Sequence, residues 1–257
     1  MEYNFDKDVR LFMIFDILGD TERTGPNLWK IDRKRLEDIK NHILDLELIV
    51  RILRRLLPNN LDYDRIYDYI ICHDLPEAIT GDITKFQGIS SEEISRVTNI
   101  AIEYLENNFS DVIDFGTILR NYEARVDLES KIVNMIDKVH SSTTFIKYQS
   151  EKNVNMDDPR VIPELRQHPF VVKKIKEGKD IADIFFEFHM KAVNISDEEC
   201  KKYNISRECA DSIVTAISGF ANEMYNKKLN GTLFDVKKSF PQEAMIYIQK
   251  IEEESKK

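Results

Sequence analysis

Apolar residues recur every three or four positions along most of this chain, the spacing that places them on one face of an α-helix. Before residue 150, such stretches cover about residues 9–18, 36–57, 63–74, 91–107 and 127–148. Beyond it, they cover about residues 181–193, 206–229 and 242–254. We find no convincing alternation of apolar and polar residues, the pattern typical of strands. The sequence therefore predicts an all-α fold.

Breaks in the periodicity divide these helices. Residues 20–30 contain the turn-forming run TGPN, so we expect a loop that carries Arg23 and Trp29. Pro76 is expected to interrupt or kink the helix that ends near residue 74. In the helix after Ser90, we expect these apolar side chains to face the core: Ile94, Val97, Ile100, Ala101 and Leu105.

The segment 150–163 is polar and aperiodic, which indicates a linker or a long surface loop. It divides the chain into two parts. We expect a helical bundle over residues 8–150. Residues 151–257 are expected to form a helical extension that packs on the bundle or mediates oligomerisation.

Composition and charge narrow the possible partners. The chain has 42% hydrophobic and 32% charged residues, with only eight glycines and seven prolines, which fits a globular helical protein. Its net charge of -9 would repel a nucleic-acid polymer, and no long basic run compensates. A small phosphate ester is still possible, because one arginine and a metal ion can overcome the repulsion locally.

Cysteine usage and hydropathy bear on the compartment. Cys72, Cys200 and Cys209 lack the spacing of a metal finger and suit a reducing environment. The first residues lack the basic start and long apolar core of a signal peptide, and no run of about twenty apolar residues could span a membrane. We therefore expect a cytoplasmic protein without a membrane partner.

Four side chains stand out as possible metal ligands. His42 lies on or beside an apolar stripe, His73 and Asp74 end another helix, and Asp137 sits among apolar positions of a third. Two imidazoles and two carboxylates suit a divalent ion such as Mn, Co, Fe, Ni, Zn or Mg and leave positions open for water and a phosphate oxygen. Either histidine alone would more often be an ordinary core residue. Their order and helical context favour a site.

At these residues the chain resembles the HD phosphohydrolases, in particular the group of the 5'-deoxynucleotidases. The run HDLPEAITGDI, residues 73–83, is similar to the HD..E...GD signature of that group. Glu37 precedes His42 by five positions as in the group, and Lys131 and the pair Asp137-Lys138 lie in a segment similar to the last ligand helix. The resemblance covers about residues 8–148 and implies an HD-domain helical bundle.

The resemblance also implies residue roles. The metal would be held by the residues matching the family's ligands, which are His42, His73, Asp74 and Asp137. Glu77 would position or activate water, although it could be a solvated glutamate at a helix end. Asp82 would bind the 3'-hydroxyl of a deoxynucleotide or assist proton transfer, and its alternative is a turn or N-cap aspartate.

The run Arg23-Thr24-Gly25 looks like the group's R-T-G-W turn, in which the arginine would bind the phosphate. Here Pro26 replaces the expected tryptophan, and Trp29 comes three residues later. Since that aromatic ring fills the space of a ribose 2'-hydroxyl in the group, selectivity for deoxyribose is an open question. Trp29 either replaces the ring spatially or anchors the loop to the core.

These features lead us to expect a metal-dependent hydrolase of (deoxy)nucleoside 5'-monophosphates, and the resemblance suggests a homodimer. One alternative is another HD nucleotide hydrolase, acting on nucleoside triphosphates or guanosine tetraphosphate, although no basic cluster accompanies the His-Asp pair. Another is a non-catalytic HD protein that binds metal or nucleotide. His140, three residues after Asp137, is either a group that supports the metal ligands or an ordinary partly buried histidine.

Overall fold

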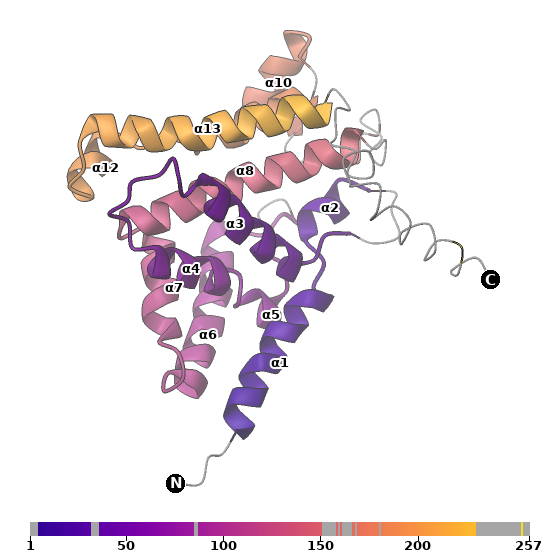
Figure 1. Ribbon diagram of the computed structural model, residues 1–257. Coiled ribbons are helices and arrows are strands. Elements are labelled where there is room, and N and C mark those ends of the chain that lie inside the picture. The colour runs from indigo at the N-terminus through magenta and orange to yellow at the C-terminus, as the bar shows by residue number, and fades with distance from the viewer. Residues whose placement is uncertain are drawn as a thin grey trace.

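The structure is a computed structural model that describes residues 5–31, 36–84, 87–150, 169–179 and 181–229, together with residues 158, 160, 166, 167 and 253. The prediction of an all-α fold is confirmed (Figure 1). Among these residues, the only extended pairing is an isolated bridge between Glu22 and Asp38. In the same part of the chain, no helix has the length and apolar character needed to cross a membrane.

The first part of the chain supplies the helices α1 (Asp6–Asp20), α2 (Thr24–Leu28), α3 (Ile39–Leu53), α4 (Tyr63–Cys72), α5 (Glu77–Thr80), α6 (Ser91–Phe109), α7 (Phe115–Ala124) and α8 (Leu128–Ser150). The periodicity located all of them except α2, α5 and α7. Helix α2 occupies the predicted loop, where it forms a single short turn of helix after Arg23. As predicted, the helix before Pro76 ends at Cys72, and the chain resumes as α5.

Side-chain caps explain where several of these helices begin. Asp38, Asp62, Ser90 and Asp114 each accept a hydrogen bond from the backbone N–H three residues later, at the starts of α3, α4, α6 and α7. Such a cap satisfies one of the N–H groups that a helix leaves unpaired at its first turn. The local sequence therefore fixes where α3 and α4 start, and with them the positions of His42 and His73.

The second part supplies α10 (Pro169–Lys176), α11 (Ile181–Met190), α12 (Asp197–Lys202) and α13 (Arg207–Leu229). Helices α11 and α13 agree with two predicted stretches, whereas α10 and α12 were not predicted. In Figure 1, α13 runs alongside α8 across one side of the molecule, and both α13 and α11 pack on α8. The linker expected at 150–163 and the helix expected at 242–254 lie almost wholly outside the described residues.

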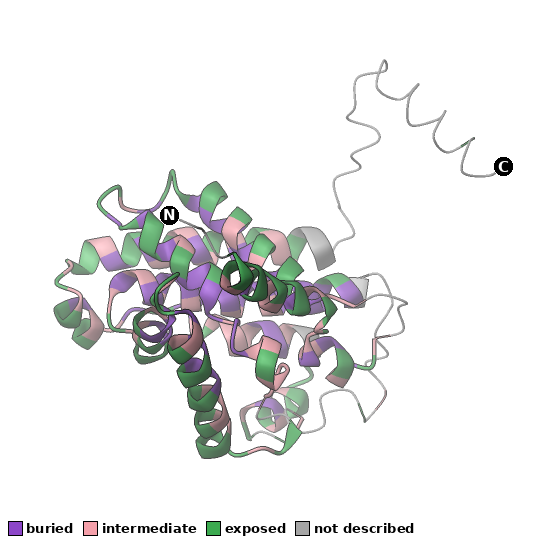
Figure 2. Cartoon of the chain, turned by 90° about the horizontal axis from the view of Figure 1, so that it is seen from below, coloured by how far each residue is buried: buried purple, intermediate pink, exposed green. Residues whose placement is uncertain are grey.

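Helix α8 lies at the centre of the main core. One continuous cluster of buried side chains joins α3, α4, α8 and α13, and its members with at most 1% exposure include Leu46, Ile66, Ile136, Ile213 and Ile217. Figure 2 shows the buried positions concentrated where the helices face one another. The extension thus shares the core of the bundle, and α8 is covered from both sides. A polar side chain on such a helix requires its own partners.

Helix α6 corrects one sequence-based expectation. Ala101 and Leu105 are buried as predicted, but Ile100 is 54% exposed and Ile102, which was not expected inside, is 1% exposed. The reason is that the first half of the inward face does not pack against apolar residues. It presents Ser91, Ser95 and Thr98 to a cavity instead, so the apolar positions alone did not indicate the buried side.

Which face of α6 is buried can be tested with two matched substitutions. Ile102→Ala should lower the free energy of unfolding by about 2–5 kcal/mol, because it removes a buried side chain and leaves a cavity. Ile100→Ala, the same chemical change on the exposed face, should cost under about 0.5 kcal/mol. Urea denaturation of both variants measures the difference. Equal costs, or a larger cost at Ile100, would show that the helix is oriented as the sequence pattern suggested.

Candidate metal centre

Three helices bring the four predicted ligands together. His42 lies in the first turn of α3, and Asp137 lies in the middle of α8. His73 caps the C-terminal end of α4, where its N–H still bonds to the carbonyl of Tyr69 at 2.9 Å. Asp74 follows directly. His42 and Asp137 thereby become neighbours, although they are 95 positions apart in the chain.

The ligand atoms of neighbouring residues converge to within 3.2–3.6 Å of one another. The Nε2 atom of His42 is 3.2 Å from Oδ1 of Asp137 and 3.6 Å from Oδ2 of Asp74. The Nε2 atom of His73 is 3.2 Å from the same Asp74 oxygen. One nitrogen of each histidine and one oxygen of Asp137 all lie within 4.8 Å of one another. Small movements of these side chains would bring the atoms around one ion.

The two imidazole nitrogens are the strongest sign of a metal site. Nε2 of His42 and Nε2 of His73 are both buried, and neither has a hydrogen-bond partner of acceptable geometry. A buried polar atom without a partner costs about 1–3 kcal/mol, so native proteins seldom leave two side by side. A divalent ion would satisfy both atoms at once. The residues present therefore fit a metal.

The other nitrogen of His73 supports this interpretation. Nδ1 lies 2.9 Å from the carbonyl oxygen of Ile70, which can only accept, so Nδ1 carries the proton. In the neutral ring Nε2 then has the free electron pair, and this atom lies 3.2 Å from Oδ2 of Asp74. A histidine that donates its second N–H to a carbonyl is the usual arrangement of a metal ligand, because the bond fixes both the tautomer and the ring orientation.

The electrostatics of His42, Asp74 and Asp137 favour their metal-binding forms, whereas at His73 the carboxylate of Asp74 outweighs burial and raises the pKa. Burial, followed by the charge of Arg23, lowers the pKa of His42 to about 3, so this imidazole is neutral. Burial opposes ionisation of Asp74, but His73 outweighs it and lowers the pKa of Asp74 to about 2. Burial also opposes ionisation of Asp137, yet Lys138 and His42 together hold its pKa well below the ordinary value. Both aspartates are therefore carboxylates.

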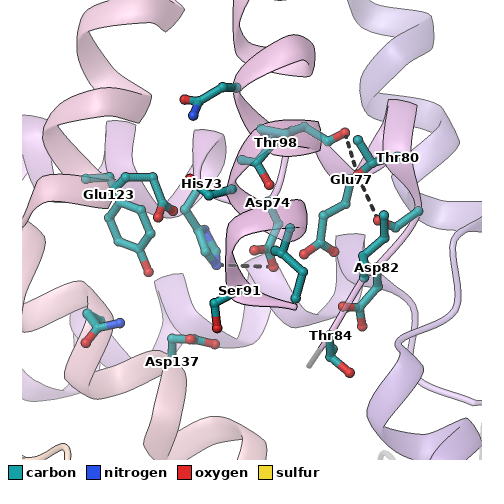
Figure 3. A pocket seen from close by; sticks show the side chains of 18 of the residues that line it. His73, Asp74, Glu77, Thr80, Asp82, Thr84, Ser91, Thr98, Glu123 and Asp137 are labelled. Atoms are coloured by element: carbon teal, nitrogen blue, oxygen red, sulfur yellow. Dashed lines mark hydrogen bonds and ion pairs between the residues drawn. The ribbon is translucent and has the colours of Figure 1, made fainter. Parts of the chain in front are cut away.

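The ligands open into a cavity of about 540 Å³ between α4, α5, α6, α7 and α8. In Figure 3 the carboxylates of Asp74, Glu77, Asp82 and Asp137 all face this space. Its lining holds five acidic residues against three basic ones. A phosphate ester would be repelled by this excess unless a cation were bound, so the charge balance also favours a metal ion.

Glu77 lies one turn beyond His73, at the start of α5, and lines the same cavity. Burial and then the carboxylates of Asp74 and Asp82 raise the pKa of Glu77 well above its ordinary value. A carboxyl group with a raised pKa is typical of sites that transfer protons. The structure thus brings Glu77 to the predicted ligands in an environment suited to acid–base chemistry.

Asp82 and Arg23 meet across the cavity. The backbone N–H of Thr24 donates to Oδ2 of Asp82 at 2.6 Å, which ties the Arg23 segment to the turn after α5. That turn depends on Gly81, which has a φ of 71°, a backbone conformation that would be strained for a residue with a side chain. Nε of Arg23 is 3.8 Å from Glu37 and one terminal nitrogen is 3.4 Å from Ser141, whereas its Nη1 is buried without a partner.

Trp29 does not lie at the metal-binding cavity. Its ring is 5% exposed and contacts Phe145 of α8 edge-on at a centroid distance of 4.7 Å and Phe185 of α11 at 5.6 Å. It lines a smaller pocket of about 160 Å³, which shares Arg23, Asp82, Thr84 and Lys138 with the larger cavity. Of the two roles considered for Trp29, this position favours anchoring the Arg23 segment to the core.

The structure adds a residue that the sequence reasoning did not single out, Tyr122 of α7, which lines the cavity. It also gives a contact to Lys138, whose Nζ lies 2.7 Å from the carboxylate of Asp137. Helix α7 itself carried a signal, since Asp114 precedes apolar residues at helical spacing.

His140 is 4% exposed, and its Nδ1 lies 2.8 Å from Nδ1 of His42. It therefore contacts a proposed ligand directly.

Comparison with known proteins agrees with this geometry. A family model described as the HD domain matches residues 15–177, more than half of the chain. The chain belongs to the HD domain family. The match includes α3, α4 and α8, the helices that carry the proposed ligands of this HD domain, and it ends before α11 and α13.

Individual relatives of this HD protein are distant. The 5'-deoxynucleotidase hdd1 of Schizosaccharomyces pombe is 25% identical over 162 residues, covering 60% of this chain and 79% of the relative. The 5'-deoxynucleotidase HDDC2 of Xenopus laevis is 22% identical over 142 residues, covering 54% and 69%. A conserved hypothetical protein from Pyrococcus furiosus has a TM-score of 0.48 and 18% identity, covering 65% of this chain and 99% of that protein.

Proposed function

We propose that this HD protein is a metal-dependent phosphohydrolase that cleaves nucleoside 5'-monophosphates into nucleoside and phosphate. The observation that carries the proposal is the pair of buried Nε2 atoms of His42 and His73, which lack a hydrogen bond and lie beside Asp137, next to a cavity that also holds Glu77 and Arg23. The names of the two distant relatives support the substrate class.

In this proposal His42, His73, Asp74 and Asp137 hold the divalent ion. When bound, the ion supplies Lewis acidity, which polarises a phosphoryl oxygen and makes water more acidic. Arg23 binds the phosphate oxygens: Glu37 and Ser141 hold the guanidinium in place, and its unpartnered Nη1 is available to an anion. Burial opposes the charge of Arg23, but four surrounding carboxylates, led by Glu37, outweigh it and raise the pKa, so the side chain stays cationic.

Glu77 accepts the proton of the attacking water. Its raised pKa places proton exchange closer to neutral pH than for an exposed glutamate, which favours general base catalysis. Asp82 contributes in two ways: Oδ2 fixes the Arg23 segment through Thr24, and the same carboxylate lies on the cavity wall where a sugar hydroxyl could donate to it. The polar side chains of α6, Ser91, Ser95 and Thr98, offer further partners for sugar or base.

The position of Trp29 bears on sugar selectivity. Because its ring packs against Phe145 and Phe185, it does not occupy space in the metal-binding cavity. We therefore propose that ribonucleoside and deoxyribonucleoside monophosphates are both accepted. The hydrolysis of nucleoside triphosphates is the alternative, and the gathering of Arg23, Arg125 and Lys138 at one cavity is the observation in its favour.

Phosphate release tests the proposal. After removal of metal with EDTA and re-addition of Mn, Co, Zn, Ni or Mg, the protein should release phosphate from nucleoside 5'-monophosphates, with deoxy and ribo rates within about tenfold. Glu77→Gln should lower kcat by about 10²–10⁴-fold. Asp137→Asn, which removes a proposed ligand, should abolish the activity even when metal is added. Glu103→Gln, the same change on the exposed face of α6, should leave kcat unaltered. Metal binding without turnover of any monophosphate would refute the proposed reaction, and turnover of triphosphates alone would establish the alternative.

We further propose that the protein is a homodimer. On α1 the side chains of Val9, Phe12, Met13 and Ile17 are 45–64% exposed, and on the neighbouring α3 those of Leu44, Leu48 and Ile52 are 44–60% exposed. Monomeric proteins rarely expose so many large apolar side chains on adjacent helices. A second copy of the same surface would cover them around a two-fold axis.

Sedimentation equilibrium tests this assembly. The protein should have the mass of a dimer, and the double variant Leu44→Glu/Leu48→Glu should have that of a monomer, because four charges would otherwise be buried at the interface. Ile100→Glu, which charges an exposed isoleucine on α6, should remain dimeric. A monomeric wild-type protein would refute the proposal.

We also propose a cytoplasmic location. The structure contains free cysteines, of which Cys72 and Cys200 are buried and Cys209 is partly exposed. Unpaired thiols of this kind are typical of proteins that remain in a reducing compartment. Fractionation of cells should place the protein with the cytosolic markers, and its recovery from an oxidising compartment would contradict the proposal.

A further inference from the structure

A chain of three side chains extends from the candidate metal centre to the surface. His42, which is fully buried, places Nδ1 2.8 Å from Nδ1 of His140. His140 is 4% exposed, and its Nε2 lies 3.1 Å from Oδ2 of Asp45. Asp45 is one helical turn after His42 on α3, and its side chain is 52% exposed. The chain thus runs from α3 to α8 and back to α3.

The positions of the protons in this chain follow from which atoms can donate. A carboxylate only accepts, so the contact with Asp45 requires the proton of a neutral His140 to be on Nε2. Oε1 of Glu37 lies 3.8 Å from the same nitrogen, too far for a hydrogen bond, and its negative charge favours a proton on that side of the ring. Nδ1 of His140 then has a lone pair, and the 2.8 Å contact is a hydrogen bond only if Nδ1 of His42 carries the proton.

This assignment decides which atom His42 offers to the cavity. Nε2 of His42 lies 3.2 Å from Oδ1 of Asp137, but not with the geometry of a hydrogen bond, so the contact of Nδ1 with His140 is the one that decides the tautomer. With its proton on Nδ1, His42 presents the lone pair of Nε2 beside Asp74 and Asp137. In the opposite tautomer His140 would carry its proton on Nδ1, and His42 would turn an N–H toward the ion. We propose that Asp45 and His140 are positioning residues that hold His42 in its ligating tautomer and orientation. The proposal rests on the metal site proposed above.

The two histidine ligands differ in how they are fixed. A backbone carbonyl, that of Ile70, fixes His73, and no substitution removes it. His42 depends on side chains, so its support can be altered without touching a ligand. Outer partners of this kind typically change metal affinity by about 10–100-fold when they are lost.

The tautomers can be measured directly in the metal-free protein. Two-bond ¹⁵N–¹H correlation spectra of histidine-labelled protein should show His42 protonated on Nδ1 and His140 protonated on Nε2, with assignments from His42→Gln and His140→Gln. Asp45→Ala should increase the population of His140 protonated on Nδ1. A His42 ring protonated on Nε2 in the wild-type protein would overturn the proposal. Because no metal is present, this result does not depend on catalysis or on metal binding.

Metal affinity provides the second readout, by isothermal titration with Zn or Mn. Asp45→Ala should raise the dissociation constant about tenfold. Glu47→Ala removes a carboxylate two residues later on the same helix, where it pairs with Arg51, and should leave the dissociation constant within twofold of the wild-type value.

Substitutions at His140 separate positioning from packing. His140→Leu should weaken binding at least as much as Asp45→Ala, whereas His140→Gln, whose amide can accept from His42 and donate to Asp45, should restore much of the affinity. Equal affinity of the Asp45→Ala and Glu47→Ala variants would overturn the proposal. If the wild-type protein binds no metal, the metal site itself fails, and the spectra still decide the tautomer of His42.

Discussion

Asp137 lies in the middle of a helix that is packed on both sides, next to two imidazoles whose inward nitrogens make no hydrogen bond of acceptable geometry. Moving a carboxylate from water into a protein interior costs several kcal/mol unless opposite charge and hydrogen bonds compensate it. Lys138 contacts one oxygen of Asp137 at 2.7 Å and together with His42 keeps that carboxyl ionised, but it provides no partner for the two imidazole nitrogens. A divalent ion between Asp137, His42 and His73 would compensate the carboxylate and the two nitrogens together.

The surrounding structure maintains this arrangement. The caps at Asp38 and Asp62 fix where α3 and α4 begin, and the extension covers the face of α8 opposite those two helices. The aromatic contacts of Trp29 with Phe145 and Phe185 connect the Arg23 segment to α8 and to α11. The family match ends at residue 177, before α11. The part of the chain beyond the match therefore helps to position a residue proposed to bind phosphate.

Much of the fold was accessible from the sequence, because helix periodicity and capping are local. The predicted positions of α3, α4, α8 and α13 agree with the structure within a few residues. The inward face of α6 was misjudged at Ile100, since the helix borders a cavity and its polar side chains face inward there. Helix α7 was overlooked although its cap and apolar spacing were present.

The candidate site was predictable where its residues form a recognisable run, and less so where they meet only in the folded chain. The residues predicted as ligands do converge, since His73 and Asp74 are adjacent and the helices of His42 and Asp137 were both identified. The contact between His42 and His140 joins residues 98 positions apart, and no spacing rule indicates it. Trp29 could not be placed from the sequence either, because its partner Phe185 belongs to the extension.

The most direct test of the central claim is a crystal structure of the protein grown with Mn or Zn, with anomalous diffraction measured at the absorption edge of that metal. The account predicts one strong anomalous peak, with Nε2 of His42, Nε2 of His73 and an oxygen of Asp137 at about 2.0–2.2 Å and Asp74 completing the set. A cavity that gives no anomalous peak at saturating metal, or a peak held by other side chains, would contradict it.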